Sequence, residues 1–257
     1  GGVDTLLLPG TRLAIHHGGN AHLGTVGRKP IHLLNEMERA KVQFEDLWVD
    51  CGFTSLSHAK RSVAIGDPIT FCTDPRDMSD DLLCTRSADN KVGNAMLLEL
   101  MKRLKGAACA YDIFFVSTRQ EEIGLRGAIT AANMVKPDYC IVLDATHATD
   151  YPSTKPSLHG RLSLGAGPAI SISPDTHQGL RENLLAVARQ EKIPYQIEAH
   201  PNATGTESKA IQLQSGGICT ATLSYPVRYM HSPSEIVSKS DVRHAINLLF
   251  SFISNER

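Results

Sequence analysis

The sequence lacks both an excess of charge of either sign and a long apolar run. Its 257 residues include 26 Lys and Arg against 27 Asp and Glu, which gives a formal net charge of −1. Without a basic excess there is no general field to hold nucleic acid or an anionic membrane surface, so we expect neither as a partner. The best apolar stretches, residues 113–116 and 246–250, fall far short of the ~18 residues of a membrane span. We therefore predict a soluble protein.

Cysteines are sparse and widely spaced. The six occur at positions 51, 72, 84, 109, 140 and 219, with no C-x-x-C pair among them. This spacing does not form a dense disulfide framework, and it favours reduced thiols in a cytoplasmic protein. The chain opens Gly1-Gly2-Val3, with neither an initiator Met nor a charged and then apolar leader, which indicates a processed start or a fragment.

The composition is that of a globular protein, and the pattern along the chain divides it in two. Residues 1–80 are rich in glycine and in short β-like runs, near residues 11–15, 23–26 and 47–49, with helical stretches near 33–42 and 55–65. The stretch 73–81 is polar, carries a proline and shows no periodicity, so we place a domain junction there. We predict a small β-rich domain over residues 1–80 and a second domain over residues 81–257.

From about residue 84, apolar runs of strand length alternate with amphipathic helices. The predicted strands cover residues 111–117, 139–144, 169–173, 195–198 and 219–224. The predicted helices cover residues 90–105, 124–134, 178–190, 208–214 and 239–253. This alternation is typical of the α/β class, in which a mostly parallel central sheet is flanked by helices.

Two adjacent carboxylates, Glu121 and Glu122, directly follow an apolar run and precede a helix start. Functional sites in α/β sheets gather at the carboxyl ends of the strands, so the position suits a reaction. Neighbouring side chains in an extended or turn geometry point in different directions, so one carboxylate can bind a metal while the other faces a water. An isolated acidic pair is more commonly a solvated turn at a helix start.

Three more polar residues occupy similar positions. Asp144 closes an apolar strand, Asp89 begins a long helix, and His231 follows another strand by a short loop. Each has an ordinary explanation by itself: a turn or cap for Asp144, a helix cap for Asp89 and a surface loop for His231. Together with Glu122 they form an oxygen and imidazole set that suits Zn²⁺, Mn²⁺ or Co²⁺ in a hydrolytic site, with Glu121 as a spare carboxylate.

In order and chemistry these motifs resemble the M42 family of metallo-aminopeptidases, the group of glutamyl aminopeptidase and the tetrahedral TET peptidases. Residues 24–32 and 46–52 are similar to the β-rich module inserted in that family. S-A-D-N-K-V-G at residues 87–93 and Q-E-E-I-G-L-R-G-A at 120–128 resemble its bridging-aspartate and Glu-Glu motifs. Residues 143–152 and 226–232 complete a set of four ordered motifs, which is a specific signal.

The resemblance implies a zinc-peptidase-like catalytic domain acting as a two-metal aminopeptidase on oligopeptides. Asp89 would bridge two divalent ions, Glu122 and His231 would hold one of them, and Asp144 would hold the other. Glu121 would be the general base for the water between them. Zn²⁺ is the first expectation for the ions, with Co²⁺ or Mn²⁺ as alternatives. The β-rich domain would serve dimerisation, so the resemblance also implies a cytoplasmic homo-oligomer built from dimers, up to a dodecamer.

The chain departs from the family in two places. A His-x-Asp motif, which would supply a second ligand to the metal held by Asp144, is absent from the sequence. We interpret this as a missing beginning, the alternative being a degenerate paralogue that serves as a metal-binding or oligomeric scaffold. Retention of both Glu121 and Glu122 argues against the scaffold. Glu207 stands where the family usually has Asp after Gly-Thr, which keeps the charge and changes the geometry of the substrate pocket.

Overall fold

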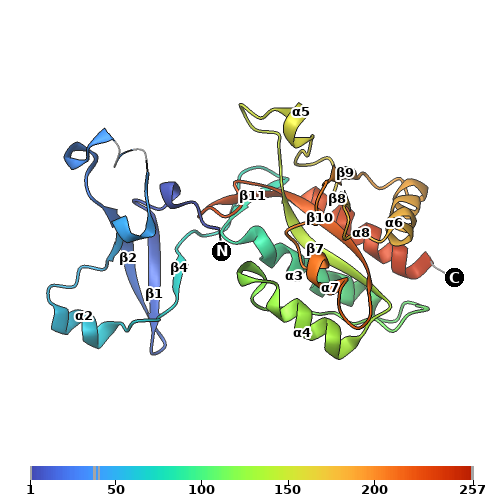
Figure 1. Cartoon of the computed structure of the whole chain (residues 1–257), viewed down its shortest axis with the longest axis horizontal. Coiled ribbons are helices and arrows are strands. Elements are labelled where there is room, and N and C mark those ends of the chain that lie inside the picture. The colour runs from blue at the N-terminus through green and yellow to red at the C-terminus, as the bar shows by residue number, and fades with distance from the viewer. Residues whose placement is uncertain (1, 37–38, 40, 256–257) are drawn as a thin grey trace.

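The computed structural model describes residues 2–36, 39 and 41–255. Two lobes of unequal size make up the molecule, and they meet near the amino terminus (Figure 1). The smaller lobe contains a four-stranded sheet and the larger lobe a seven-stranded sheet, counted over the described residues. The two sheets share no strand, and the chain passes from the first to the second between residues 71 and 76.

The smaller lobe is an antiparallel sheet with the strand order β3-β2-β1-β4. Its strands are β1 (Arg12–His17), β2 (Asn20–Arg28), β3 (Leu47–Asp50) and β4 (Ile69–Phe71). Strands β1 and β2 form a hairpin through Gly18 and Gly19, whose φ angles of 53° and 83° suit a tight turn. The predicted β-like runs are therefore confirmed, and β4 is an addition.

Short helices surround this sheet. Within the described residues, the helices of this lobe are α2 (Leu56–Ser62) and the 3₁₀ turns η1 (Thr5–Leu7), η2 (Ile31–Leu33) and η3 (Phe44–Asp46). Ser55 caps α2 by accepting the N–H of His58 at its side chain, and this confirms the helix expected near residues 55–65. The helix expected near residues 33–42 includes positions 37, 38 and 40, which lie outside the described residues.

The sheet of the larger lobe is mixed. Its path is β5-β6-β11-β10-β8-β9, and β7 pairs with β10. The strands are β5 (Arg76–Asp77), β6 (Leu82–Thr85), β7 (Tyr139–His147), β8 (Ala169–Ile172), β9 (Gln196–Ala199), β10 (Cys219–Arg228) and β11 (Glu235–Ser238). The pairs β7–β10 and β8–β9 are parallel, whereas the other pairs are antiparallel.

The α/β class is confirmed, and the strand directions differ from the mostly parallel sheet expected from the sequence. Only residues 229–234 connect β10 to β11, and so short a connection joins antiparallel neighbours because a parallel crossover needs a dozen residues or more. The central pair β7–β10 is long and parallel, as continuous apolar runs predict.

Helices cover both faces of this sheet. Helices α3 (Ala88–Leu104), α6 (Gln178–Gln190) and α8 (Lys239–Asn255) pack together over one face, and α4 (Arg126–Val135) and α7 (Ser208–Ile211) pack on the other. Helix α5 (Pro156–His159) lies in the connection after β7 (Figure 1). Among the described helices, none combines the length and the apolar character needed to cross a membrane.

Alternation along β7 determines which residues face the site. Ile141 and Leu143 pack into the larger core under α3, α6 and α8, whereas Val142 packs into the smaller core under α4 and α7. Because successive side chains of a strand point to opposite faces, Asp144 and Thr146 lie on the same face as Val142.

The strand predicted at residues 111–117 is not formed. The backbone groups of residues 112–117 make no hydrogen bond with any other described residue, and a strand requires a paired neighbour. Side chains nevertheless alternate as on a strand edge: Phe115 packs against the larger core, whereas Phe114 and Val116 are exposed. The apolar run alone could not distinguish a paired strand from this unpaired segment.

Candidate metal centre

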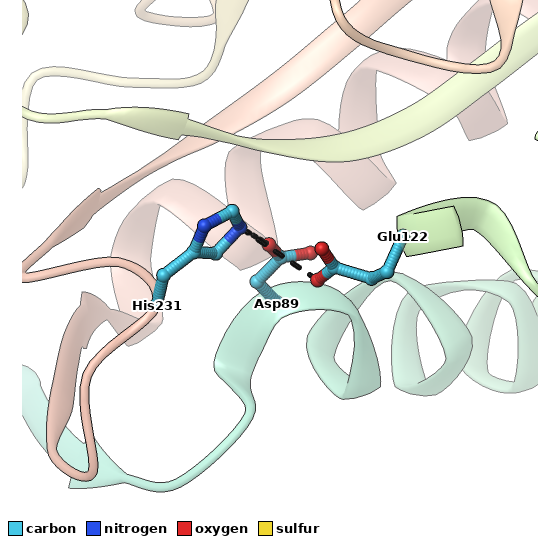
Figure 2. Close-up of side chains that lie close together, drawn as sticks. All are labelled: Asp89, Glu122 and His231. Carbon is cyan, nitrogen blue, oxygen red and sulfur yellow. Dashed lines mark hydrogen bonds and ion pairs between the residues drawn. The ribbon is translucent and has the colours of Figure 1, made fainter. Parts of the chain in front are cut away.

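Three ligand-type side chains from distant parts of the chain converge in the larger lobe (Figure 2). Asp89 comes from the start of α3, Glu122 from the 3₁₀ turn η4 (Glu121–Ile123), and His231 from the loop between β10 and β11. One ligand atom from each lies within 4.8 Å of the others. Nε2 of His231 is 3.2 Å from Oδ2 of Asp89 and 3.6 Å from Oε1 of Glu122. Carboxylates with an imidazole are a common ligand set for Zn²⁺ and related ions.

The buried carboxylate of Glu235 holds two of these residues by their backbones. Glu235 is 2% exposed and accepts the N–H of Asp89 at 3.1 Å and the N–H of His231 at 2.8 Å. Burial raises the pKa of Glu235 above its usual range. This role could not be predicted from the sequence, because an acidic residue that opens a short strand gives no signal that its carboxylate is turned inward.

Asp144 lies near this cluster and is connected to it through Asn90. Oδ1 of Asp144 accepts hydrogen bonds from Nδ2 of Asn90 and from the N–H of Ala145, both at 2.9 Å. The hydroxyl of Tyr225 donates to Oδ1 of Asn90 at 2.9 Å and fixes the amide. Burial, with the nearby charge of Asp89, raises the pKa of Asp144 to about 8. Among the described residues, the close ligand group does not include Asp144.

Glu121 lines the same cavity as the three clustered residues and Asp144. Partial burial, followed by the charges of Glu122 and Asp89, raises its pKa to about 7. Burial and the charge of Glu122 likewise raise the pKa of Asp89, although His231 opposes that shift. A carboxylate that titrates near neutral pH is suited to accept and return a proton.

The segments that carry these residues contain unusual backbone angles. Ser87, Gln120 and His231 have φ angles of 51°, 62° and 62°, in the left-handed region that non-glycine residues seldom occupy. Conformations of this kind cost about 1–3 kcal/mol each and persist where the surrounding structure imposes them. The local backbone is therefore held in place by the same contacts that bring the ligand side chains together.

The cavity extends beyond the cluster along the carboxyl ends of the strands. Its volume is about 440 Å³. Besides the cluster it is lined by polar residues from β7 to β10, namely Thr146, His147, Ser171, Glu198, His200 and Ser224. His147 is exposed at the end of β7 and contributes to this lining. Glu198 and His200 were missed, although a Glu-x-His pair closing a predicted strand is the kind of signal that marked Asp144.

Glu207 is not among the described residues that line this cavity. It accepts a hydrogen bond from the hydroxyl of Thr118, just before Glu121 in the chain, and its burial raises its pKa. Its charge is also one of the causes that raise the pKa of Glu121. Thr204, Gly205 and Thr206, which precede it, do line the cavity.

A helix-flanked α/β sheet with carboxylates and a histidine gathered beside its strand ends is an arrangement that can hold a divalent metal ion. The model of the M42 glutamyl aminopeptidase family matches residues 1–248. The chain therefore belongs to the M42 glutamyl aminopeptidase family, and the family and hydrolase class that its motifs predicted are confirmed.

Individual relatives agree with this assignment. The lysyl aminopeptidase of Pyrococcus furiosus is 33% identical over 230 residues, which are 88% of this chain and 64% of that protein. The solved TET aminopeptidase of Thaumarchaeota archaeon SCGC AB-539-E09 is 31% identical with a TM-score of 0.92, covering 99% of this chain and 73% of its own. The TET1 peptidase of Pyrococcus horikoshii is 27% identical with a TM-score of 0.86, covering 100% and 75%. The chain spans about two thirds of the length of the curated relatives it matches.

Proposed function

We propose that the protein is a two-metal aminopeptidase that removes the N-terminal residue from oligopeptides. In this proposal Glu122 and His231 would hold one divalent ion, Asp144 would hold the other, and Asp89 would contribute to both. The observation that carries it is the convergence of three ligand atoms within 4.8 Å from segments far apart in the sequence. Zn²⁺ is our first choice for the ions, and Co²⁺ and Mn²⁺ suit the same donors.

The charge of the cavity supports the binding of cations. Five carboxylates line it, those of Asp89, Glu121, Glu122, Asp144 and Glu198, and no Lys or Arg is among its described lining residues. Burial raises the pKa of Asp89, that of Glu121 to about 7 and that of Asp144 to about 8, and neighbouring carboxylates add to each shift, so a bound cation would favour their charged forms. When bound, divalent ions supply a Lewis acid that polarises a carbonyl group and makes a water molecule more acidic.

Glu121 is the residue we assign to proton transfer. It would accept a proton at its carboxylate as the oxygen of water attacks the scissile carbonyl carbon. It would then return the proton to the leaving amine nitrogen as the carbon–nitrogen bond breaks. A pKa of about 7 places its proton affinity near the working range for both steps. Asn90 and Glu235 would position the ligand residues by the hydrogen bonds described above.

We propose that the smaller lobe, which the sequence placed at residues 1–80 and whose last strand ends at Phe71, acts as a dimerisation module beside a catalytic domain that begins with β5 at Arg76 rather than at residue 81. Large apolar side chains are exposed on the smaller lobe, including Leu23, Leu33, Phe44, Trp48 and Leu56. Exposed apolar surface of this kind is typical of subunit contacts. The Pyrococcus horikoshii relative can assemble into a tetrahedron or a large octahedral shell. We extend such assembly, and a cytoplasmic location, to this protein as part of the proposal.

Hydrolysis of peptides by the metal-loaded protein and its Glu121→Gln variant tests this function. We expect the variant to lose turnover by a factor of about 10²–10⁴, because the proton acceptor is gone, while metal content by elemental analysis stays unchanged. Glu182→Gln is the matched control, since Glu182 is exposed on α6 over the opposite sheet face. A wild-type protein that binds metal and hydrolyses no peptide would instead favour the scaffold.

A further inference from the structure

The cavity has a second polar wall, separate from the metal ligands, formed by Glu198, Thr146 and His200. The hydroxyl of Thr146 donates a hydrogen bond to Oε1 of Glu198, and Nε2 of His200 lies 3.1 Å from the same oxygen. The other oxygen, Oε2, accepts no hydrogen bond from the described residues. The side chain of Glu198 is 15% exposed and lines the cavity, so its accessible part faces the space that a substrate would occupy.

Glu198 lies outside the close group of ligand atoms and pairs with Thr146 and His200 instead. Over the described residues a single group has three ligand atoms close enough to hold an ion, and it consists of Asp89, Glu122 and His231. The charge of ions bound at that group would be balanced by the carboxylates that hold them. The carboxylate of Glu198, in contrast, has no Lys or Arg beside it among the described residues that line the cavity. Nε2 of His200 can offset part of this charge, and it lies against Oε1.

The strand geometry separates the carboxylate of Glu198 from the metal ligands, beside which the scissile carbonyl of a substrate would lie. Asp144 and Thr146 are two residues apart on β7, so their side chains share a face and are separated by about 7 Å along the strand. Glu198 contacts Thr146 and lies opposite Ser171 on the same face. The α-amine of a substrate is bonded to the carbon next to the carbonyl and must stay beside the metal ligands. The side chain of that N-terminal residue is the part long enough to reach Glu198.

We infer that Glu198 selects peptides whose N-terminal residue carries a cationic side chain, lysine or arginine. Both have long methylene stems that end in charged N–H donors, and Oε2 of Glu198 is the acceptor. Thr146 and His200 position the carboxylate through Oε1. The inference rests on the proposed aminopeptidase function and names its substrate class.

Steady-state kinetics on four aminoacyl p-nitroanilides, those of lysine, arginine, leucine and glutamate, test the inference with the metal-loaded protein. We expect wild-type kcat/KM to be about tenfold or more higher for lysine and arginine than for leucine, and lowest for glutamate, because a hydrogen bond to a charged group is involved. Glu198→Gln should lower kcat/KM for the two cationic substrates by about tenfold or more, with less than about a twofold change for leucine. Glu182→Gln, far from the cavity, should change none of them.

Two further measurements separate the possible outcomes. Glu198→Arg should reverse the order and favour glutamate, while metal content and melting temperature report whether each variant is intact. An equal loss on all four substrates in Glu198→Gln would overturn the inference, because it would mean that Glu198 acts on the α-amine or the metals. Wild-type hydrolysis without a cationic preference would overturn this inference alone. No hydrolysis of any substrate would overturn the proposed function as well.

Discussion

Replacing Asp144 by Asn removes a buried charge while preserving its hydrogen bonds. Both donors to Asp144, Nδ2 of Asn90 and the N–H of Ala145, bind the same oxygen, Oδ1, which an asparagine retains. Asp144 is 7% exposed, so its charge has little access to water in the metal-free protein. We therefore predict that Asp144→Asn stabilises the metal-free protein at alkaline pH and weakens its binding of metal.

The direction and size of this effect follow from the pKa of Asp144. The folded protein keeps a proton on this group up to a pKa of about 8, whereas the unfolded chain releases it near 3.8. The contribution to stability is therefore complete below about pH 4 and is lost as the pH rises through about 8. A shift of about four units at 1.36 kcal/mol per unit sets a ceiling of about 5 kcal/mol. Rearrangement and water entry around the buried charge reduce our expectation to about 2–4 kcal/mol.

Urea unfolding of the metal-free protein in chelator, at about pH 5 and about pH 9, measures the effect. We expect the variant to exceed wild type by about 2–4 kcal/mol at the higher pH, and the difference to fall to about a third of that at the lower pH, which is about one pH unit above the unfolded pKa of 3.8. Asp112→Asn is the control, because Asp112 is exposed. Equal pH dependence in wild type and Asp144→Asn would refute the reasoning, since it would show that Asp144 is not held protonated in the folded protein.

Three further predictions concern the metal centre. His231→Ala should lower metal affinity by at least about tenfold, because an imidazole ligand is lost; retention of full metal after dialysis would contradict this. In Glu235→Gln one of the two accepting oxygens becomes an NH₂ group, which cannot accept the backbone N–H that it faces. The free energy of unfolding should therefore fall by about 1–3 kcal/mol. An unchanged urea midpoint would exclude the role given to Glu235. Chelation should abolish peptide hydrolysis and lower Tm. Added Zn²⁺, Co²⁺ or Mn²⁺ should restore both, with activity reaching a plateau as the site fills and Tm rising with the logarithm of ion concentration; activity that survives chelation would argue against a metal enzyme.

The local pattern of apolar residues was enough to predict the long helices and strands. The helix at residues 178–190 has its apolar positions Leu180, Leu184 and Leu185 on one stripe, and the structure forms it with those bounds. The strand β10 was expected from a continuous apolar run and is buried on both faces between helices. The four ordered motifs also sufficed for the family, because their residue types and order are specific.

The local sequence pattern was not enough where the formation of a strand depends on a neighbouring strand. Residues 111–117 carry a strand-like apolar run and have no described strand beside them, whereas β6 and β11 are short and pair with each other. A strand is stabilised by cross-strand contacts with its neighbour, and the identity of that neighbour is not written in the segment itself.

The same division applies to the candidate site. The sequence by itself singled out Asp89, Glu122, Asp144 and His231 as candidate metal ligands, because they are oxygen and imidazole donors within motifs that resemble those of the family. Only the tertiary structure decided that a buried Glu235 holds two of those backbones and that Glu198 faces the cavity. Both are ordinary acidic residues in strands, and burial and neighbours, which arise only when distant segments pack together, determine what a carboxylate can do.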